Sequence, residues 1–376
     1  MTTTHEMPDV AAGRPPGDLP RRLFGHLHRS DQQRWGHVYL QGLMRTQGKK
    51  TVRRMAAVVT GSEAASTSLH QFVNASPWEW ARARGELARW AAQSLPVRAW
   101  TLAPAVLPKR GSHSVGVHQR FLPESGRTVN CQLGFGLFLD SGRAHVPVDW
   151  RLFLPPRFTR DEAVRDRVKI PETEEAEPLW AHALRLVEEV TSWSNGRTAP
   201  VVADLTALCD VVPLARRLHG SGHSFVLAIP GQTTLADPEL PPGERESVRG
   251  MLLRRGVRHP AGAGRQVVSY DTQVRGLRPD GEPGRTAGRL LAEWDASGGR
   301  PGRIWLTNIT DRHPAEVLEL ARSPRGAQAA IHRMGEDFGL LDFEGRSFPG
   351  WHRHMTLVSA AYACSTLEGM ERRPIA

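Results

Sequence analysis

The order of short apolar segments between Trp100 and Pro230 constrains the fold more than any other feature of this sequence. Extended segments rich in β-branched and aromatic residues come first, separated by Gly, Pro and Ser: WTLAPAVL, SHSVGVHQRFL, NCQLGFGLFLD and HVPVDWRLFLP. A helix, a buried strand, a second helix and a second buried strand follow: EAEPLWAHALRLVEEVTSW, PVVADL, VVPLARRLHGSG and SFVLAIP. Hairpin strands followed by alternating helices and strands predict a mixed α/β sheet.

This order predicts a ribonuclease-H-like core, so the expected fold class is α/β. The first hundred residues predict short basic helices, which suit either a helix-turn-helix-like DNA-binding domain or an ordinary helical cap with solvated arginines. A later segment rich in Gly, Pro and Arg, with one clear strand (RQVVSYDTQV), reads as a β-rich insertion. The sequence thus predicts a flexible tail (1–19) and a helical, DNA-binding domain (20–98). A two-part core (99–230 with 302–376) and an insertion (231–301) follow.

Charge and composition narrow the class of partner. The 376 residues carry a formal net charge of +10, which favours a polyanionic partner, with nucleic acid first. There is no apolar stretch of about 18 residues and no apolar segment of a secretory signal, so we expect a cytoplasmic protein with no membrane partner. The cysteines are far apart and form no CxxC pair, which argues against a disulfide framework: Cys131, Cys209 and Cys364.

Several longer stretches resemble the DDE transposases of bacterial insertion sequences, in the branch common in actinobacteria. They are SDQQRWGHVYLQGL, LHQFVNASPWEW, PKRGSHSVGVHQRF, NCQLGFGLFL, VDWRLFLP and FEGRSFPGWHRHMTLVSAAYA. The resemblance implies a ribonuclease-H-like core, an N-terminal helical domain, an inserted β-rich segment, and three carboxylates that bind two Mg²⁺ ions. Such ions, about 3.5–4 Å apart, hold the attacking and leaving oxygens of an in-line displacement, and Mg²⁺ requires oxygen ligands.

The resemblance places these three carboxylates at positions where the chain retains one. The first falls on Ala103 in the first strand, and the second is retained as Asp204 at the end of PVVADL. The third falls on Gln328, in a helix that also contains Pro324 and Gly335 where the family signature has other residues. We therefore expect the nuclease chemistry to be lost and no cofactor to be needed, with Mg²⁺ at Asp204 only if residual activity remains.

Other groups offer weaker alternatives. We expect Asp140, Asp149 and Asp210 to be solvated strand ends or helix caps. Asp342 and Glu344 are expected to lie near the missing helix acid. A zinc cluster of His113, His118, His352 and His354 is disfavoured, because residues at i and i+2 of a helix point to different faces.

The cations expected to contact DNA phosphates form one cluster near a helix start: Arg45, Lys49, Lys50, Arg53 and Arg54. A solvated basic face explains the same cluster. The leading hypothesis is a transposase-like DNA-binding protein, possible as a homodimer, that has lost strand cleavage and transfer. A recruited scaffold is one alternative, with Ala103, Pro104 and Gln328 lining a less polar cleft that accepts another ligand, or with non-nuclease chemistry. An active transposase with relocated acids is the other.

Overall fold

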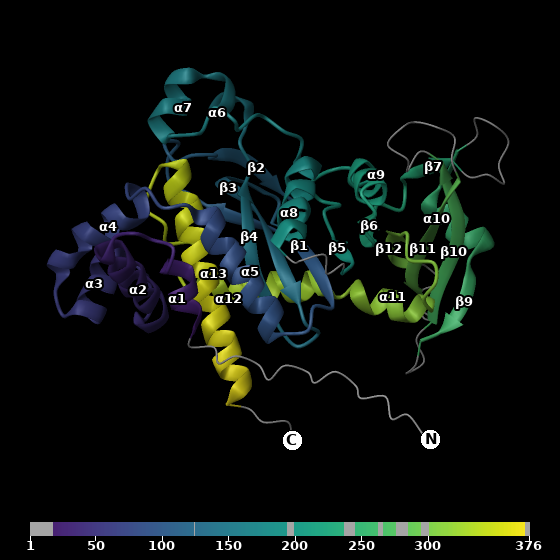
Figure 1. The fold of residues 1–376 in the computed structure, drawn as a ribbon. Helices are drawn as coiled ribbons and strands as arrows, with labels where there is room; N and C mark the ends of the chain where they lie inside the picture. The colour runs from purple at the N-terminus through teal and green to yellow at the C-terminus, as the bar shows by residue number, and fades with distance from the viewer. Residues whose placement is uncertain are drawn as a thin grey trace, which may run out of the picture.

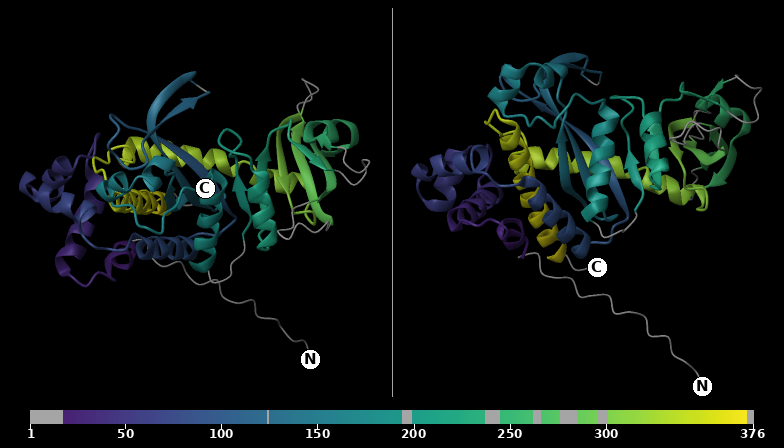
Figure 2. Two further views of the ribbon diagram at one scale, coloured as in Figure 1. Left: turned by 90° about the horizontal axis from the view of Figure 1, so that it is seen from above. Right: turned by 45° about the horizontal axis from the view of Figure 1, so that its top comes forward.

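The computed structural model describes residues 18–123, 125–193, 199–236, 245–261, 266–275, 285–294 and 301–372. The expected tail, 1–19, lies almost wholly outside the described residues. One large sheet runs through the molecule, with the N-terminal helices at one end and the strands β9 to β11 at the other (Figures 1 and 2).

Within the described residues, the segment from Leu19 to Ser94 is mainly helical, as predicted. The helices are α1 Leu19–Phe24, α2 Ser30–Arg45, α3 Val52–Thr60, the short 3-10 helix η2 Glu63–Ala65, α4 Ser66–Asn74 and α5 Trp80–Ser94. Local signals set the limits of α3, because the Thr51 hydroxyl accepts a hydrogen bond from the Arg54 amide and Gly61 ends the helix at φ 71°. The apolar stripe of α2 buries Tyr39, Leu40 and Leu43.

The core sheet has the predicted mixed character, which confirms the ribonuclease-H-like α/β class. Its strands are β1 Ala99–Pro108, β2 His118–Leu122, β3 Arg127–Asp140, β4 His145–Leu152, β5 Val201–Ala203 and β6 Phe225–Ile229. β3 pairs antiparallel with β1 on one side and with β2 and β4 on the other, whereas β1, β5 and β6 are parallel. A Cβ atom on Gly136 would lie 2.9 Å from the Trp150 ring, so this strand approaches its neighbour too closely for a side chain.

Strands after β6 extend the same sheet. They and the adjoining elements are β7 Thr234–Ala236, β8 Arg245–Ser247, α10 Val248–Arg255, β9 Val257–Pro260, β10 Gln266–Arg275, β11 Arg285–Trp294 and β12 Pro301–Thr307. β12 pairs antiparallel with β6, and β11, β10 and β9 follow in that order. Among its described residues, the segment 231–301 therefore adds β9, β10 and β11 to the sheet of the core.

Helices cover both faces of the sheet. The remaining helices are α6 Pro156–Arg160, α7 Glu162–Val168, α8 Leu179–Trp193, α9 Val212–Gly220, α11 Pro314–Leu320, α12 Ser323–Asp337 and α13 Phe348–Glu371. On α8, His182 stacks on Phe135, with ring centroids 6.0 Å apart. On α12, Ser323 donates a hydrogen bond to Asp140. Because side chains alternate along β3, Phe135 and Asp140 point to opposite faces, and α8 and α12 lie on opposite sides of the sheet.

Candidate active site

The first two predicted acid positions lie next to each other in the sheet. The parallel pairing of β1 with β5 ends at Leu102 opposite Ala203, so Ala103 and Asp204 follow in register. Ala103 is opposite Gly136 of β3, on the face that also carries Asp140 and faces α12. Its methyl group is 1% exposed and offers no metal ligand. Asp204, at the end of β5, is the one carboxylate of the pair.

The third position also reaches this site. Gln328 lies on α12, and its side-chain amide (Nε2) donates a hydrogen bond of 2.9 Å to the main-chain carbonyl of Pro104 in β1. The helix is continuous, because Pro324 lies in its first turn, where a proline is tolerated. The structure thus brings Ala103, Asp204 and Gln328 together while two of them lack a carboxylate.

The carboxylate of Asp204 already has partners. Arg303 of β12 reaches past β6 and forms an ion pair with it through Nη1. The Thr206 hydroxyl donates a 2.8 Å hydrogen bond to Asp204 Oδ1. The side chains of Asp204 and Arg303 are 23% and 53% exposed, so the pair lies at the surface of the site. Arg303 could not be recognised from the sequence, because only the sheet order places β12 two strands from β5.

These residues do not fit the two divalent ions that the family resemblance implies. Mg²⁺ requires several oxygen ligands, and a two-metal site requires carboxylates that both ions share. Here one position is a methyl group, one is an amide that donates to a carbonyl, and the only acid is paired with a guanidinium. In the described part of the chain, no group of three or more His, Cys, Asp or Glu side chains is arranged to hold a metal ion.

The other acids considered from the sequence have structural partners. Asp140 and Asp149 are buried, not solvated as expected, because Asp140 accepts from Ser323 and Asp149 pairs with Arg84. Asp210 is exposed and accepts a hydrogen bond from the Val212 amide just before α9, whose N-cap residue is Val211. The last two acids each contact a lysine of the predicted basic cluster: Asp342 accepts from the Lys50 amide, and Glu344 lies 3.5 Å from the Lys49 ammonium.

The histidines considered for zinc are used elsewhere. His352 and His354 lie inside α13, and burial holds the pKa of His354 at about 3 and that of His352 well below its ordinary value. His354 bonds to the Tyr39 hydroxyl and the Gly339 carbonyl. His118 bonds to the Gly116 carbonyl in a loop beside the sheet. The rings of His118, His352 and His354 therefore fill space in the fold and form hydrogen bonds within it.

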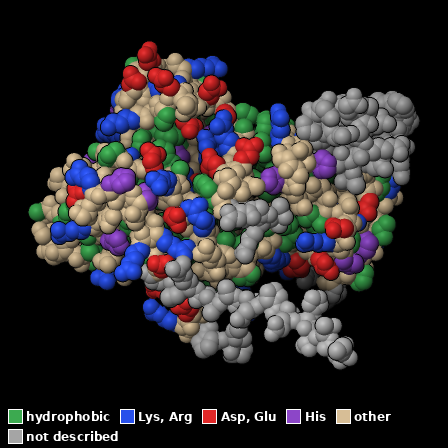
Figure 3. Space-filling view, in the orientation of Figure 1, with side chains coloured by type: hydrophobic (Ala, Val, Ile, Leu, Met, Phe, Trp, Pro, Cys, Tyr) green, Lys and Arg blue, Asp and Glu red, His purple; other side chains and the backbone are tan. Residues whose placement is uncertain are grey.

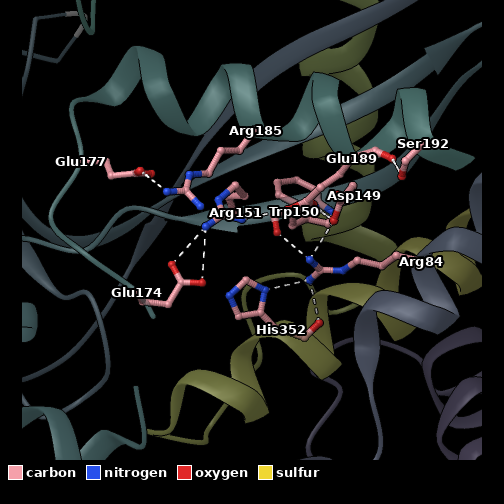
Figure 4. A network of polar contacts seen from close by, with 10 residues as sticks. All are labelled: Arg84, Asp149, Trp150, Arg151, Glu174, Glu177, Arg185, Glu189, Ser192 and His352. Carbon is pink, nitrogen blue, oxygen red and sulfur yellow. Dashed lines mark hydrogen bonds and ion pairs between the residues drawn. The ribbon is translucent and has the colours of Figure 1, made fainter. Parts of the chain in front are cut away.

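A buried charge network joins the N-terminal helices to the sheet (Figure 4). Arg84 of α5 pairs with Asp149 of β4 at 2.8 Å and also donates to the carbonyls of Trp150 and His352. Beside it, Arg151 pairs with Glu174 at 3.0 Å and donates a 3.0 Å hydrogen bond to Glu189. Partial burial and the neighbouring Asp149 carboxylate raise the pKa of Glu189 to about 8. This network could not be predicted from the sequence, because Arg84 looks like one of several solvated arginines on α5.

Of the five cations predicted to contact DNA, four are exposed and one is buried. Arg45, Lys49, Arg53 and Arg54 are exposed at the end of α2 and the start of α3. Arg53 pairs with Glu63 at 2.5 Å, and Arg54 donates to the Gln47 carbonyl. Lys50 is 5% exposed and donates to the Thr46 carbonyl, and its burial lowers its pKa. On the face shown in Figure 3, cations over these helices are interspersed with acidic and histidine side chains.

A hollow adjoins this basic cluster. It has a volume of about 610 Å³ and lies between α2, α12 and α13, where its lining includes Arg45, Lys50, Arg333 and Asp337. Beside Ala103 and Pro104, where an apolar cleft was predicted, the exposed Gln328 side chain donates a hydrogen bond to the Pro104 carbonyl.

Comparison with known proteins gives one family. A model of the family described as "DDE superfamily endonuclease" matches residues 22–278. No curated protein matches the sequence. Among the described residues, no helix has the length and apolar character needed to cross a membrane.

Proposed function

Because the chain belongs to the DDE superfamily of endonucleases, we propose that it is a transposase-derived protein that binds DNA without cutting it. The family provides the link to DNA, and the positive net charge of +10 supports a polyanionic partner.

The proposal that cleavage is lost rests on the residues that surround Asp204. Strand cleavage in this family depends on metal ions held by three carboxylates, and a lone carboxylate cannot hold two divalent ions. Ala103 and Gln328 occupy the other two positions, and Arg303 neutralises Asp204. This arrangement supports the interpretation of the protein as a pseudoenzyme that retains the nuclease fold without its metal ligands.

The exposed members of the basic cluster are the proposed DNA contacts. Arg45, Lys49, Arg53 and Arg54 lie on neighbouring helix ends, where exposed cations can meet phosphates without reading bases. Lys50 is excluded from this set, because its buried ammonium bonds to a carbonyl of its own domain.

The binding proposal is tested with a fluorescent duplex of random sequence, measured by anisotropy at several salt concentrations with and without Mg²⁺. Replacing the four exposed cations by Gln should weaken binding at least tenfold at low salt and lower the slope of log K against log salt, because fewer counterions are released. The matched control replaces four exposed cations around α6 to α8 by Gln: Arg160, Arg167, Lys169 and Arg185. Equal binding by the two variants would contradict the assignment of the contacts.

A further inference from the structure

We propose that Arg303 has taken over the role of the metal cation in the former nuclease site and contacts a DNA phosphate there. This inference rests on the proposed DNA binding and adds a second contact region, separate from the basic cluster near α3. It assigns to Arg303 a binding role that requires no divalent ion.

The position of Arg303 supports this role. It lies on β12, and its Nη1 reaches the Asp204 carboxylate at the end of β5. Asp204 is in register with Ala103, and Gln328 approaches the same strand from α12. The guanidinium therefore lies against the one acid that remains of the expected metal-binding set.

The charges in the site differ from those of the family arrangement. In the family arrangement, three negative carboxylates are offset by two divalent ions, and the ions attract the phosphate. Here the methyl group of Ala103 and the amide of Gln328 carry no charge, so a single guanidinium balances Asp204. The two missing carboxylates would have repelled a phosphate, and without them the site can accept one in the absence of metal.

Arg303 also has the geometry to bind a phosphate. Its side chain is 53% exposed, and within the described residues its hydrogen bonds to Asp204 and Thr206 both use Nη1. A guanidinium carries five N–H donors in a planar fork that matches the oxygens of a phosphate. The Nε and Nη2 donors can therefore face a phosphate while Nη1 keeps its contact with Asp204.

The alternative is that Arg303 only ties β12 to the end of β5. The two roles differ in the effect of removing Asp204. If Arg303 binds phosphate, Asp204→Asn releases the guanidinium and removes a repulsive charge, so DNA affinity rises or stays equal. If Arg303 is only a tether, Asp204→Asn and Arg303→Gln break the same contact and act alike.

The experiment compares duplex binding by the full-length protein and three variants without divalent ions. Arg303→Gln should weaken binding about three- to tenfold near 0.1 M salt and lower the salt slope by about one phosphate contact, whereas Asp204→Asn should not weaken it. Arg322→Gln is the matched control, because Arg322 is 51% exposed and pairs with Glu319 on α11, outside the site. Thermal unfolding of each variant separates loss of binding from loss of fold.

The outcomes are distinct. A loss with Arg303→Gln that exceeds the loss with Arg322→Gln, together with equal or tighter binding by Asp204→Asn, supports the phosphate contact. Equal effects of Arg303→Gln and Arg322→Gln, or weaker binding by Asp204→Asn, overturn it while wild-type binding still supports the proposed function. No binding by the wild-type protein overturns both.

Discussion

Arg84 and Asp149 form an ion pair in the interior, with 2.8 Å between Nη1 and Oδ1 and side chains 4% and 0% exposed. The pair joins α5 to β4, and Arg84 also donates to Thr356 of α13 at 2.8 Å. A buried charge without its partner costs far more than an exposed one. We therefore expect the packing of α5 against β4 and α13 to depend on this contact.

Removing one partner should be strongly destabilising. We expect Arg84→Met to lower the free energy of unfolding by about 3–5 kcal/mol, because Asp149 is left charged and buried. The double variant Arg84→Met with Asp149→Asn should recover part of that loss, because no buried charge remains. Urea unfolding followed by circular dichroism measures both. A loss below about 1 kcal/mol in the single variant would show that the pair does not hold the interface.

The raised pKa of Glu189 predicts a pH dependence of stability. The native pKa is about 8 against an ordinary value of 4.5, so between these values the folded state binds a proton that the unfolded state releases. The contribution of Glu189 to stability is therefore complete below about pH 4.5, falls as the pH rises, and is lost above about pH 8. Its neighbours in this environment are Asp149, Arg151 and Arg84.

The measurement compares wild type with Glu189→Gln by urea unfolding from pH 5 to pH 9. The Glu189→Gln variant has no carboxyl group at this position, so its free energy of unfolding should lack the decline that Glu189 causes in wild type. The variant should therefore become more stable relative to wild type as the pH rises. The effect should be modest, because 40% of the side chain is exposed. A difference that does not change with pH would contradict the shifted pKa.

Two glycines of α12 give a matched test of where this helix packs. A Cβ atom on Gly326 would lie 2.0 Å from the His145 ring, whereas one on Gly335 would lie 3.7 Å from the Leu341 side chain. Gly335→Ala should stabilise by up to about 1 kcal/mol through helix propensity. Gly326→Ala should destabilise by about 1–3 kcal/mol through overpacking against β4. Equal effects would mean that α12 does not press on His145.

The helix order and the sheet class followed from the sequence because the signals are local. Periodicity and punctuation predicted the hairpin strands, the buried strand before Asp204 and the late helices. The extension of the sheet by β9 to β11 was not predicted, because strand pairing between distant segments leaves no local pattern. The same limit applies to Arg303, whose partner is 99 residues away in the chain.

The sequence also did not predict which charged residues are buried. Arg84 and Lys50 look like their solvated neighbours, because a helical pattern does not reveal that another element covers a polar position. Conversely, the family resemblance indicated Ala103 and Gln328 without any geometry, and in the structure Ala103 lies in β1 beside the end of β5 while Gln328 contacts β1 at Pro104.

Restoring the missing ligands should restore a metal site. The variant Ala103→Asp, Gln328→Glu and Arg303→Gln places carboxylates at all three positions and frees Asp204. We expect millimolar Mn²⁺ to raise its Tm by about a few degrees in a saturable way, because an ion that binds only the folded state stabilises it. Adding Asp204→Asn should abolish the shift. A folded variant whose Tm ignores Mn²⁺ would show that these positions do not converge as metal ligands.

We expect the protein to bind DNA without cutting it. The most direct measurement incubates the wild-type protein with supercoiled plasmid at several salt concentrations, with and without Mg²⁺ or Mn²⁺, and scores binding and nicking in the same samples. We predict salt-sensitive binding that does not need the metal, and no nicked product. Metal-dependent nicking that disappears in Asp204→Asn would contradict the account, because it would show that Asp204 still serves as a ligand in a working nuclease site.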